Sequence, residues 1–293
     1  MRVYQVNDDF ALFILSYGRA DNVITIPSLK KAGYKGKIYF LVDDTDEQVN
    51  KYIDNFGEDN VFIFNKKEIA KTFDLMDNNK NDKCVVFARN KVFEIAKQLE
   101  LKYFVVADDD YTQFNYRFDK NNNYITATIP IKDIEAIFKS MIEYMQNTNI
   151  YTLCFAQGGD FIGGKNGGMA RAILTKRKAM NLYLFNTNRI LEFTGRINED
   201  VNMYVREGQI GKIVLTTSQL ALEQGNTQAN KGGLTDIYLD LGTYVKSFYS
   251  VMANPSAVSI ITMGNKHRRL HHMVKWNNAV PKIIRQSLKI ARL

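Results

Sequence analysis

Short apolar runs alternate along the chain with segments in which apolar residues recur every three or four positions. The runs are typical of buried strands, and the wider spacing is typical of helices with one apolar face. We expect the first five elements to be a strand at 10–16, a helix at 25–32, a strand at 37–42, a helix at 46–56 and a strand at 61–64. Thr25 is expected to be the N-cap of the first helix. This order predicts parallel strands joined by right-handed crossovers.

A polar, Asn-rich loop at 73–83 separates this opening from the remaining elements. We predict helices at 88–100, 132–147, 199–207 and 236–253, strands at 103–107, 150–155, 175–185 and 212–217, and a hairpin at 114–129. The fold class is therefore α/β, with a mostly parallel sheet flanked by helices. We expect a core at 1–225 and a basic C-terminal extension at 226–293 that packs on it.

Composition limits the class of protein. Hydrophobic residues make up 45% of the 293 positions, which is enough for a substantial core and excludes a disordered chain. The N-terminus lacks the pattern of a secretory signal, and no apolar run is long enough to cross a bilayer. Cys84 and Cys154 each lie in an apolar, strand-like run, where we expect reduced, buried thiols. These features predict a cytoplasmic protein.

Positive charge is concentrated near the C-terminus. The formal net charge is +8, and the segments KHRRLHHMVK and KIIRQSLKIAR carry much of the excess. Such asymmetry suits a polyanionic partner, either nucleic acid or an anionic membrane surface, although many basic enzymes bind only small anionic substrates. The last segment has a basic and an apolar helix face, so it is expected to lie on DNA, to lie on a membrane or to dock on its own domain.

Three consecutive aspartates follow the strand at 103–107. Open α/β sheets bind ligands at the carboxyl ends of their strands, and alternate residues of an extended chain point the same way. We therefore expect Asp108 and Asp110 on one face and Asp109 on the other. Two carboxylates so close repel each other unless a divalent cation, which prefers oxygen ligands, lies between them. The triplet predicts a metal–diphosphate site; the alternative is a solvated turn.

The loop after the first strand, which begins at Ser16, is a candidate nucleotide site. Gly18 allows close backbone approach, Tyr17 can stack on a base, and Arg19 offers a planar fork to phosphate. Its position at a strand end favours binding. The alternative is an ordinary turn with a surface arginine.

Two further segments are candidates for contact with an anionic or sugar ligand. Arg89 and Asn90 begin the predicted helix at 88–100, where the helix N-terminus favours anions. The alternative is a structural pair between Arg89 and one of the aspartates. Gly158, Gly159 and Asp160 follow a strand, and glycines leave backbone N–H groups open to sugar or phosphate oxygens. The alternative is a surface loop without a ligand, or a lid that orders when the donor binds.

The order of these segments resembles the TET-associated glycosyltransferases, which are encoded largely by bacteriophages and thought to modify hydroxymethylated DNA bases. The likeness spans roughly residues 10–205 and rests on ILSYGRADNVITIPSLKKAGY, LVDD, VFARNKVFEIA and VADDDY. It implies a mixed sheet of the GT-A type, a nucleotide-diphosphate sugar (a UDP-sugar) as donor, and Mn²⁺ or Mg²⁺ as cofactor. It also implies a 5-hydroxymethylpyrimidine in duplex DNA as acceptor, and action in the host cytoplasm if the enzyme is phage-encoded.

Roles follow from these matches and from the loop chemistry. Asp108 and Asp110 match the D-x-D pair that binds the metal. The predicted donor-binding residues are Ser16, Tyr17, Gly18, Arg19, Arg89, Asn90, Asp109, Gly158, Gly159 and Asp160.

Glu199 and Asp200 open a short helix and match the E-D pair near the acceptor pocket of such enzymes. A carboxylate there would take the proton from the acceptor hydroxyl. Asp200 is our first choice as this base and Glu199 the second. The alternative is that both acids merely complement the helix dipole.

The histidines are confined to the segment NKHRRLHH. The predicted acceptor-contacting or DNA-contacting residues are Lys231, Arg268, Arg269, His271 and His272. For the histidines we rank contact with DNA or diphosphate first and metal ligation, by His267, second.

Two rival functions remain open. One keeps the donor chemistry but transfers the sugar to a saccharide or cell-envelope acceptor. The other is a non-catalytic nucleic-acid-binding relative on a degenerate transferase fold, against which the intact D-x-D and E-D pairs argue.

Overall fold

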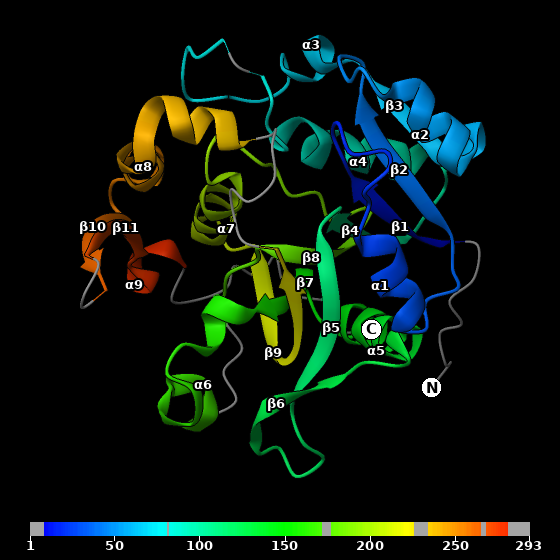
Figure 1. Cartoon of the computed structure of the whole chain (residues 1–293). Helices are drawn as coiled ribbons and strands as arrows, with labels where there is room; N and C mark the ends of the chain where they lie inside the picture. Colours follow the sequence, from blue (N-terminus) through cyan, green and yellow to red (C-terminus); the bar gives the residue numbers. More distant parts are fainter. Residues whose placement is uncertain (1–8, 81, 172–176, 226–233, 265–267, 281–293) are drawn as a thin grey trace.

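A nine-stranded mixed sheet forms the centre of the computed structural model (Figure 1). The structure describes residues 9–80, 82–171, 177–225, 234–264 and 268–280. Across the sheet the strands are β3 (Val61–Phe64), β2 (Ile38–Asp43), β1 (Phe10–Leu15), β4 (Tyr103–Asp108), β8 (Asn181–Asn186), β7 (Ile150–Gln157), β9 (Ile213–Gln224), β5 (Tyr111–Phe118) and β6 (Tyr124–Pro130). Within this sheet β8 and β5 run opposite to the other strands. The predicted mixed, mostly parallel sheet is confirmed.

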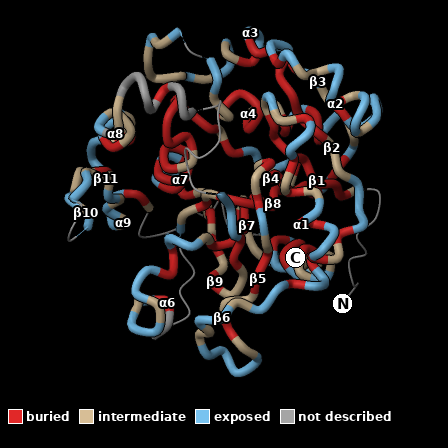
Figure 2. The backbone as a smooth tube through the Cα atoms, viewed as in Figure 1, coloured by how far each residue is buried: buried red, intermediate tan, exposed pale blue. Residues whose placement is uncertain are grey.

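Helices cover both faces of this sheet. The helices of the described residues are α1 (Thr25–Lys31), α2 (Val49–Phe56), α3 (Lys66–Ile69), α4 (Val86–Gln98), α5 (Ile134–Gln146), α6 (Gly168–Arg171), α7 (Glu199–Gln209), α8 (Leu234–Ala253) and α9 (Trp276–Ala279), with short 3-10 turns η1 (Glu58–Asn60), η2 (Gly158–Phe161) and η3 (Gly164–Asn166). Successive side chains of β1 point to opposite faces, so Phe13 packs with α4 and α7, whereas Leu12 packs with α1, α2 and α5. Figure 2 shows the resulting buried interior, with exposed residues on the outer turns.

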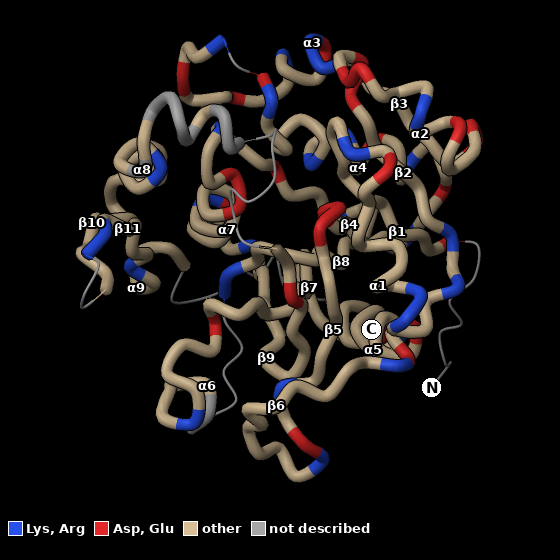
Figure 3. Tube along the Cα trace, in the orientation of Figure 1, with Lys and Arg blue, Asp and Glu red and all other residues tan. Residues whose placement is uncertain are grey.

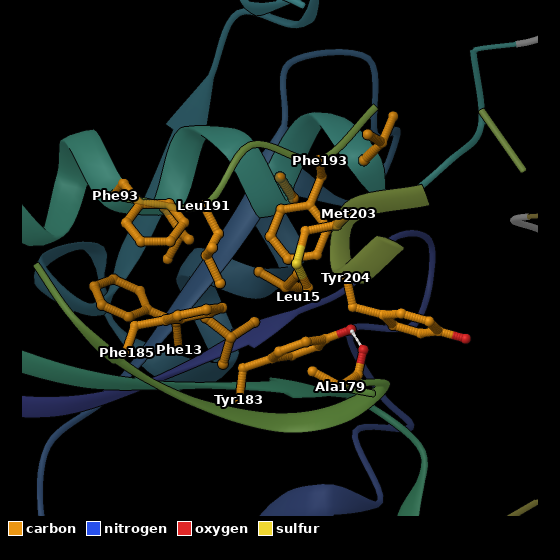
Figure 4. Packing of buried hydrophobic residues seen from close by; sticks show 14 of the residues in the cluster. Phe13, Leu15, Phe93, Ala179, Tyr183, Phe185, Leu191, Phe193, Met203 and Tyr204 are labelled. Atoms are coloured by element: carbon orange, nitrogen blue, oxygen red, sulfur yellow. Dashed lines mark hydrogen bonds between the residues drawn. The ribbon is translucent and has the colours of Figure 1, made fainter. Parts of the chain in front are cut away.

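Aromatic rings fill the face of the sheet beneath α4 and α7 (Figure 4). Phe93 packs edge-on against Phe104 at 5.3 Å between ring centroids, and Phe185 stacks on Tyr183 at 5.4 Å. Such ring pairs add specific geometry to the burial of apolar area. This face therefore gives Tyr183, which reaches the site described below, a fixed position.

The predicted N-cap of α1 is wrong. The N-cap residue is Ile24, and Thr25 lies fully buried in the first turn. The Thr25 hydroxyl donates to the carbonyl of Asp108 at 2.6 Å and accepts from the amide of Tyr111 at 2.9 Å. Thr25 thus fixes the two ends of the aspartate triplet, a long-range role that outweighs local helix capping.

Other local predictions also differ from the structure. β8 begins at Asn181, and residues 177–180 are not strand, although a strand from 175 was expected. Cys84 lies half-buried in the loop before α4 rather than in a strand, whereas Cys154 is buried in β7 as expected. The sequence pattern does not predict the antiparallel hairpin of β10 (Val258–Met263) and β11 (Arg269–Val274).

The described part of the C-terminal extension packs on α7. Ile237 and Tyr249 of α8 bury Ile197, which lies just before α7. Trp276 of α9 stacks on Tyr204 of α7, with ring centroids 5.7 Å apart. The division of the chain at residue 225 stays a prediction. Within the described ranges, no helix is both long enough and apolar enough to span a bilayer.

Candidate functional site

The aspartate triplet lines a cavity of about 240 Å³ at the carboxyl ends of β1, β2 and β4. These strands are parallel, so their carboxyl ends meet at one edge of the sheet. The loop after β1 contributes Ser16, Tyr17 and Arg19 to the same cavity. Predicted site residues that are far apart in the sequence therefore lie together in the structure.

Asp109 is held inside a hydrogen-bonded network. Its carboxylate accepts from the Ser16 hydroxyl at 2.6 Å and pairs with Arg19 at 2.5 Å. The Tyr52 hydroxyl lies 2.6 Å from the same Ser16 oxygen. Burial raises the pKa of Asp109, and the Arg19 guanidinium opposes that effect. Since Asp109 is 3% exposed, its direct contact with a donor sugar stays a prediction.

Asp108 and Asp110 are partly exposed in the cavity, in contrast to Asp109. Burial, followed by the charges of Asp108 and Asp109, raises the pKa of Asp110 to about 6. A divalent cation would relieve this repulsion and would find the oxygen ligands that it prefers. In the described part of the chain, no three His, Cys, Asp or Glu side chains form a complete metal-binding group. The two carboxylates fit a cation that shares its coordination with substrate phosphate oxygens.

Arg89 joins the two acidic motifs. It is 5% exposed at the start of α4, and its guanidinium lies 3.5 Å from Asp108 and 3.2 Å from Glu199. It also donates to the Tyr183 hydroxyl at 2.8 Å and lies over the rings of Tyr183 and Phe193, which Figure 4 labels. Burial lowers the pKa of Arg89, but Tyr183, Glu199 and Asp108 together raise it well above its ordinary value. The structural pairing of Arg89 with an aspartate is therefore present, and its contact with the donor stays a prediction.

Glu199 and Asp200 begin α7, and Figure 3 marks acidic positions both there and at the end of β4. Glu199 is buried, which raises its pKa to about 7 although Arg89 opposes the rise. Asp200 is partly exposed. Burial also raises its pKa, and the charge of Arg89 opposes this rise. Both carboxyl groups therefore bind protons more strongly than ordinary acids, as a general base requires.

The sequence matches the model of one protein family over residues 10–233, and that family is described as TET-Associated Glycosyltransferase. The chain belongs to the TET-associated glycosyltransferase family. It is therefore a glycosyltransferase, as the resemblance in the sequence implies. A search of curated proteins finds no match.

Solved structures were compared with this TET-associated glycosyltransferase. TarS residues 1–349 of S. aureus is 13% identical, with a TM-score of 0.43 over 75% of this chain and 61% of that one. Glucosyl-3-phosphoglycerate synthase of Mycobacterium tuberculosis with Mn²⁺ and UDP-glucose is 9% identical, with a TM-score of 0.45 over 90% and 86%. The same synthase with Mg²⁺ and UDP is 8% identical, with a TM-score of 0.43 over 90% of this chain and 87% of that one.

Other predicted donor-binding residues of the TET-associated glycosyltransferase lie outside the cavity lining. The Asn90 side chain pairs with the backbone of Phe193, donating to its carbonyl at 2.8 Å and accepting from its amide at 2.9 Å. Asp160 is buried and pairs with Lys178. Gly158 and Gly159 begin η2 with open space around their Cα atoms. None of these four residues lines the cavity, and their role in donor binding stays a prediction.

The predicted acceptor residues of this glycosyltransferase that the structure describes lie on the hairpin β10–β11, beside α8 (Figure 3). Arg268 and Arg269 are exposed, whereas His271 and His272 are half-buried. Burial, followed by the nearby His271 and two lysines, lowers the pKa of His272 to about 4, so that ring is neutral at pH 7. Two predicted residues, Lys231 and His267, lie outside the described residues.

Sequence reasoning missed part of the cavity of this TET-associated glycosyltransferase. Asp43 at the end of β2 lines the cavity and pairs at 2.9 Å with Lys66, which is 5% exposed. The Lys66 ammonium also lies 5.2 Å from the centroid of the Tyr17 ring. The position of Asp43 at a strand end was a usable signal, whereas nothing local marks Lys66. Lys83, Cys84 and Val85 also line the cavity and form one part of its wall.

Proposed function

We propose that this glycosyltransferase moves a sugar from a UDP-sugar to the hydroxyl of a 5-hydroxymethylpyrimidine base in duplex DNA. The observation that carries the proposal is one continuous cluster beside the cavity: Asp108, Arg89 and Glu199 are linked by contacts of 3.5 and 3.2 Å. Sugar transfer needs a site for a charged leaving group and a carboxylate base close to it. The cluster offers both.

The donor would bind in the cavity. Its apolar side, with Leu15 and Leu41, suits a nucleoside, and the Tyr17 ring offers a stacking face. Asp108 and Asp110 would hold Mn²⁺ or Mg²⁺, which when bound neutralises charge on the leaving diphosphate.

The reaction that these residues suit is a displacement at the anomeric carbon. The acceptor oxygen forms a bond to that carbon, the bond to the diphosphate oxygen breaks, and its electron pair leaves with the diphosphate. Asp200 takes the proton of the acceptor hydroxyl, and burial, which raises its pKa, makes it a stronger base than an ordinary aspartate. Glu199 is the second choice because Arg89 already engages its charge at 3.2 Å.

The proposal that DNA is the acceptor rests on the charge of the protein and on the family resemblance. The net charge is +8, and Arg268 and Arg269 are exposed on the hairpin next to α8. Exposed arginines suit phosphate contacts, and binding of this kind weakens steeply with added salt. A base in a duplex reaches a carboxylate at the start of α7 only when it is turned out of the stack.

The experiment is mass spectrometry of duplex DNA after incubation with the protein, Mn²⁺ and a panel of nucleotide sugars. Duplexes that contain 5-hydroxymethylcytosine are expected to gain the mass of one sugar, whereas matched duplexes with cytosine are not. An unchanged mass, together with release of free sugar from the donor, would overturn the DNA acceptor and favour a saccharide acceptor. Absence of any donor turnover with Mn²⁺ or Mg²⁺ would overturn the proposed donor chemistry.

A further inference from the structure

Arg196 lies three positions before Glu199 and is 1% exposed. Its guanidinium is bound to the Asn-rich loop between α3 and α4, whose described residues form neither helix nor strand. It donates to the carboxylates of Asp77 at 3.0 Å and Asp82 at 3.1 Å, and to the carbonyl of Asn79 at 2.9 Å. A planar guanidinium with five N–H donors can hold several points of a loop at once, which a lysine cannot do.

Tyr249 of α8 adds a second tie between the same segments. Its hydroxyl donates to the carbonyl of Leu75 at 2.5 Å and lies 2.6 Å from the Asp77 carboxylate. The same oxygen accepts from the amide of Arg196 at 3.2 Å. The side chain of Arg196 and the hydroxyl of Tyr249 on α8 therefore hold the loop at the same place, and the backbone amide of Arg196 is bound to that hydroxyl.

The tied loop leads directly into the cavity wall at Lys83, Cys84 and Val85. At the other end of the tie, the chain continues from Arg196 into the turn that starts α7. Burial raises the pKa of the Cys84 thiol, and the charges of Arg196 and Glu199 also act on it. The wall of the cavity and the acidic start of α7 are thus parts of one linked unit.

We propose that Arg196 is a positioning residue for donor binding, because it holds the cavity wall at Lys83–Val85 against the turn that carries Glu199. This inference rests on the proposed binding of a nucleoside diphosphate in the cavity. Arg196 acts through the loop rather than by touching the donor, since its side chain is 1% exposed and its guanidinium binds two carboxylates and a carbonyl of that loop. When the tie is lost, the wall samples open positions, and the donor binds with lower affinity.

Four variants separate this role from a general effect on folding. Arg196→Met removes the fork but keeps an apolar stem, and Arg196→Lys keeps the charge without the fork. Tyr249→Phe is milder: it removes the hydroxyl and keeps the ring that buries Ile197. Arg206→Met is the matched control, because Arg206 lies on α7 in an exposed pair with Glu192.

Affinity for UDP is measured by calorimetry in the presence of Mn²⁺, and hydrogen exchange is followed by mass spectrometry over peptides from 74–85. We expect the Kd for UDP to rise about tenfold or more in Arg196→Met and a few-fold in Arg196→Lys and Tyr249→Phe, since each lost buried charge-assisted bond is worth about a factor of ten. Exchange in 74–85 is expected to speed up in all three, while peptides from β4 keep their protection. With donor turnover, KM is expected to rise more than kcat falls.

If the affinity for UDP is unchanged in Arg196→Met and Tyr249→Phe although exchange in the loop is faster, the contacts of Arg196 serve only the stability of the loop, and the inference is wrong. Unchanged exchange would overturn it as well. If Arg196→Met does not fold, Tyr249→Phe against Arg206→Met decides the matter. If the wild-type protein binds no UDP, both the proposed donor and this role of Arg196 are wrong. That outcome differs from one in which the wild-type protein binds UDP and the variants bind it with the same affinity.

Discussion

The substitution Arg89→Met removes the cation that links the two acidic motifs while keeping an apolar stem between Tyr183 and Phe193. Removal of one partner from a buried ion pair costs about 3–5 kcal/mol, because the other charge stays buried without compensation. Here the stranded partner is Glu199, whose side chain is 7% exposed, whereas Asp108 at 31% regains water and adds little. At a pH above the pKa of Glu199, where that charge is present, we expect the Tm of a chain of this size to fall by roughly 10 °C.

The pH dependence of this loss has a definite sign. The Glu199 pKa is already raised to about 7, and Arg89 opposes the rise, so the pKa moves higher without Arg89. A carboxyl group whose folded pKa is raised binds more protons in the folded state, so stability falls as pH rises toward that pKa. In the wild-type protein this fall ends near pH 7, whereas in Arg89→Met it continues above it. The difference in stability between the two proteins therefore grows from about pH 7 to pH 9.

Urea unfolding followed by the fluorescence of the single tryptophan measures this loss, because Trp276 stacks on Tyr204 of α7. The double variant Arg89→Met/Glu199→Gln is the internal test. Once both charges are gone, most of the lost stability should return, with a coupling energy of about 2 kcal/mol or more. Equal losses in the single and double variants, or full stability in Arg89→Met, would refute the account of Arg89 as the buried counter-charge of Glu199.

Three further predictions concern the site and the fold. Asp108→Asn and Asp110→Asn are expected to abolish the rise in Tm that Mn²⁺ with UDP gives the wild-type protein, as measured by differential scanning fluorimetry; a rise that persists in both variants would remove the metal site. Asp200→Asn is expected to lower kcat by about 10²–10⁴-fold with the Kd for UDP unchanged, and wild-type turnover would eliminate it as the base. Gly33→Ala is expected to lose about 2 kcal/mol or more of unfolding free energy, because Gly33 has a φ of +89° and an added Cβ would lie 2.3 Å from the Lys132 carbonyl oxygen.

Two substitutions serve as matched controls for this group. Asp59→Asn removes an exposed carboxylate far from the cavity lining, so the Tm response to Mn²⁺ and UDP should stay as in the wild-type protein. Gly225→Ala adds a methyl group where no atom lies within 4 Å, so its unfolding free energy should change little.

Local pattern predicts most of the elements and the edge of the sheet at which the site lies. A buried strand can be recognised by its apolar run, and the parallel order of β1, β2 and β4 then places Asp108 near the loop that carries Arg19. The different environment of Asp109 also follows from the alternation of an extended chain. These features depend on short stretches of sequence, which is why the pattern contains them.

Contacts between distant residues are not contained in such patterns. Thr25 looks like a helix cap, yet its hydroxyl bonds to a carbonyl 83 positions away, and Arg196 binds Asp77 across 119 positions. The hairpin β10–β11 escaped prediction because both of its strands are mostly half-exposed, which weakens the alternation of apolar and polar residues. Lys66 has no local signal because it begins α3, whereas its partner Asp43 lies at the end of β2.

The match to the family ends at residue 233, immediately before α8 begins at Leu234. A shortened chain that stopped there would retain both acidic motifs and still lack Ile237 and Tyr249, which shield Ile197 from water. We therefore expect such a fragment to aggregate or to be cleaved quickly by proteases. In this enzyme we expect the unit that folds cooperatively to extend beyond the part of the chain that matches the family.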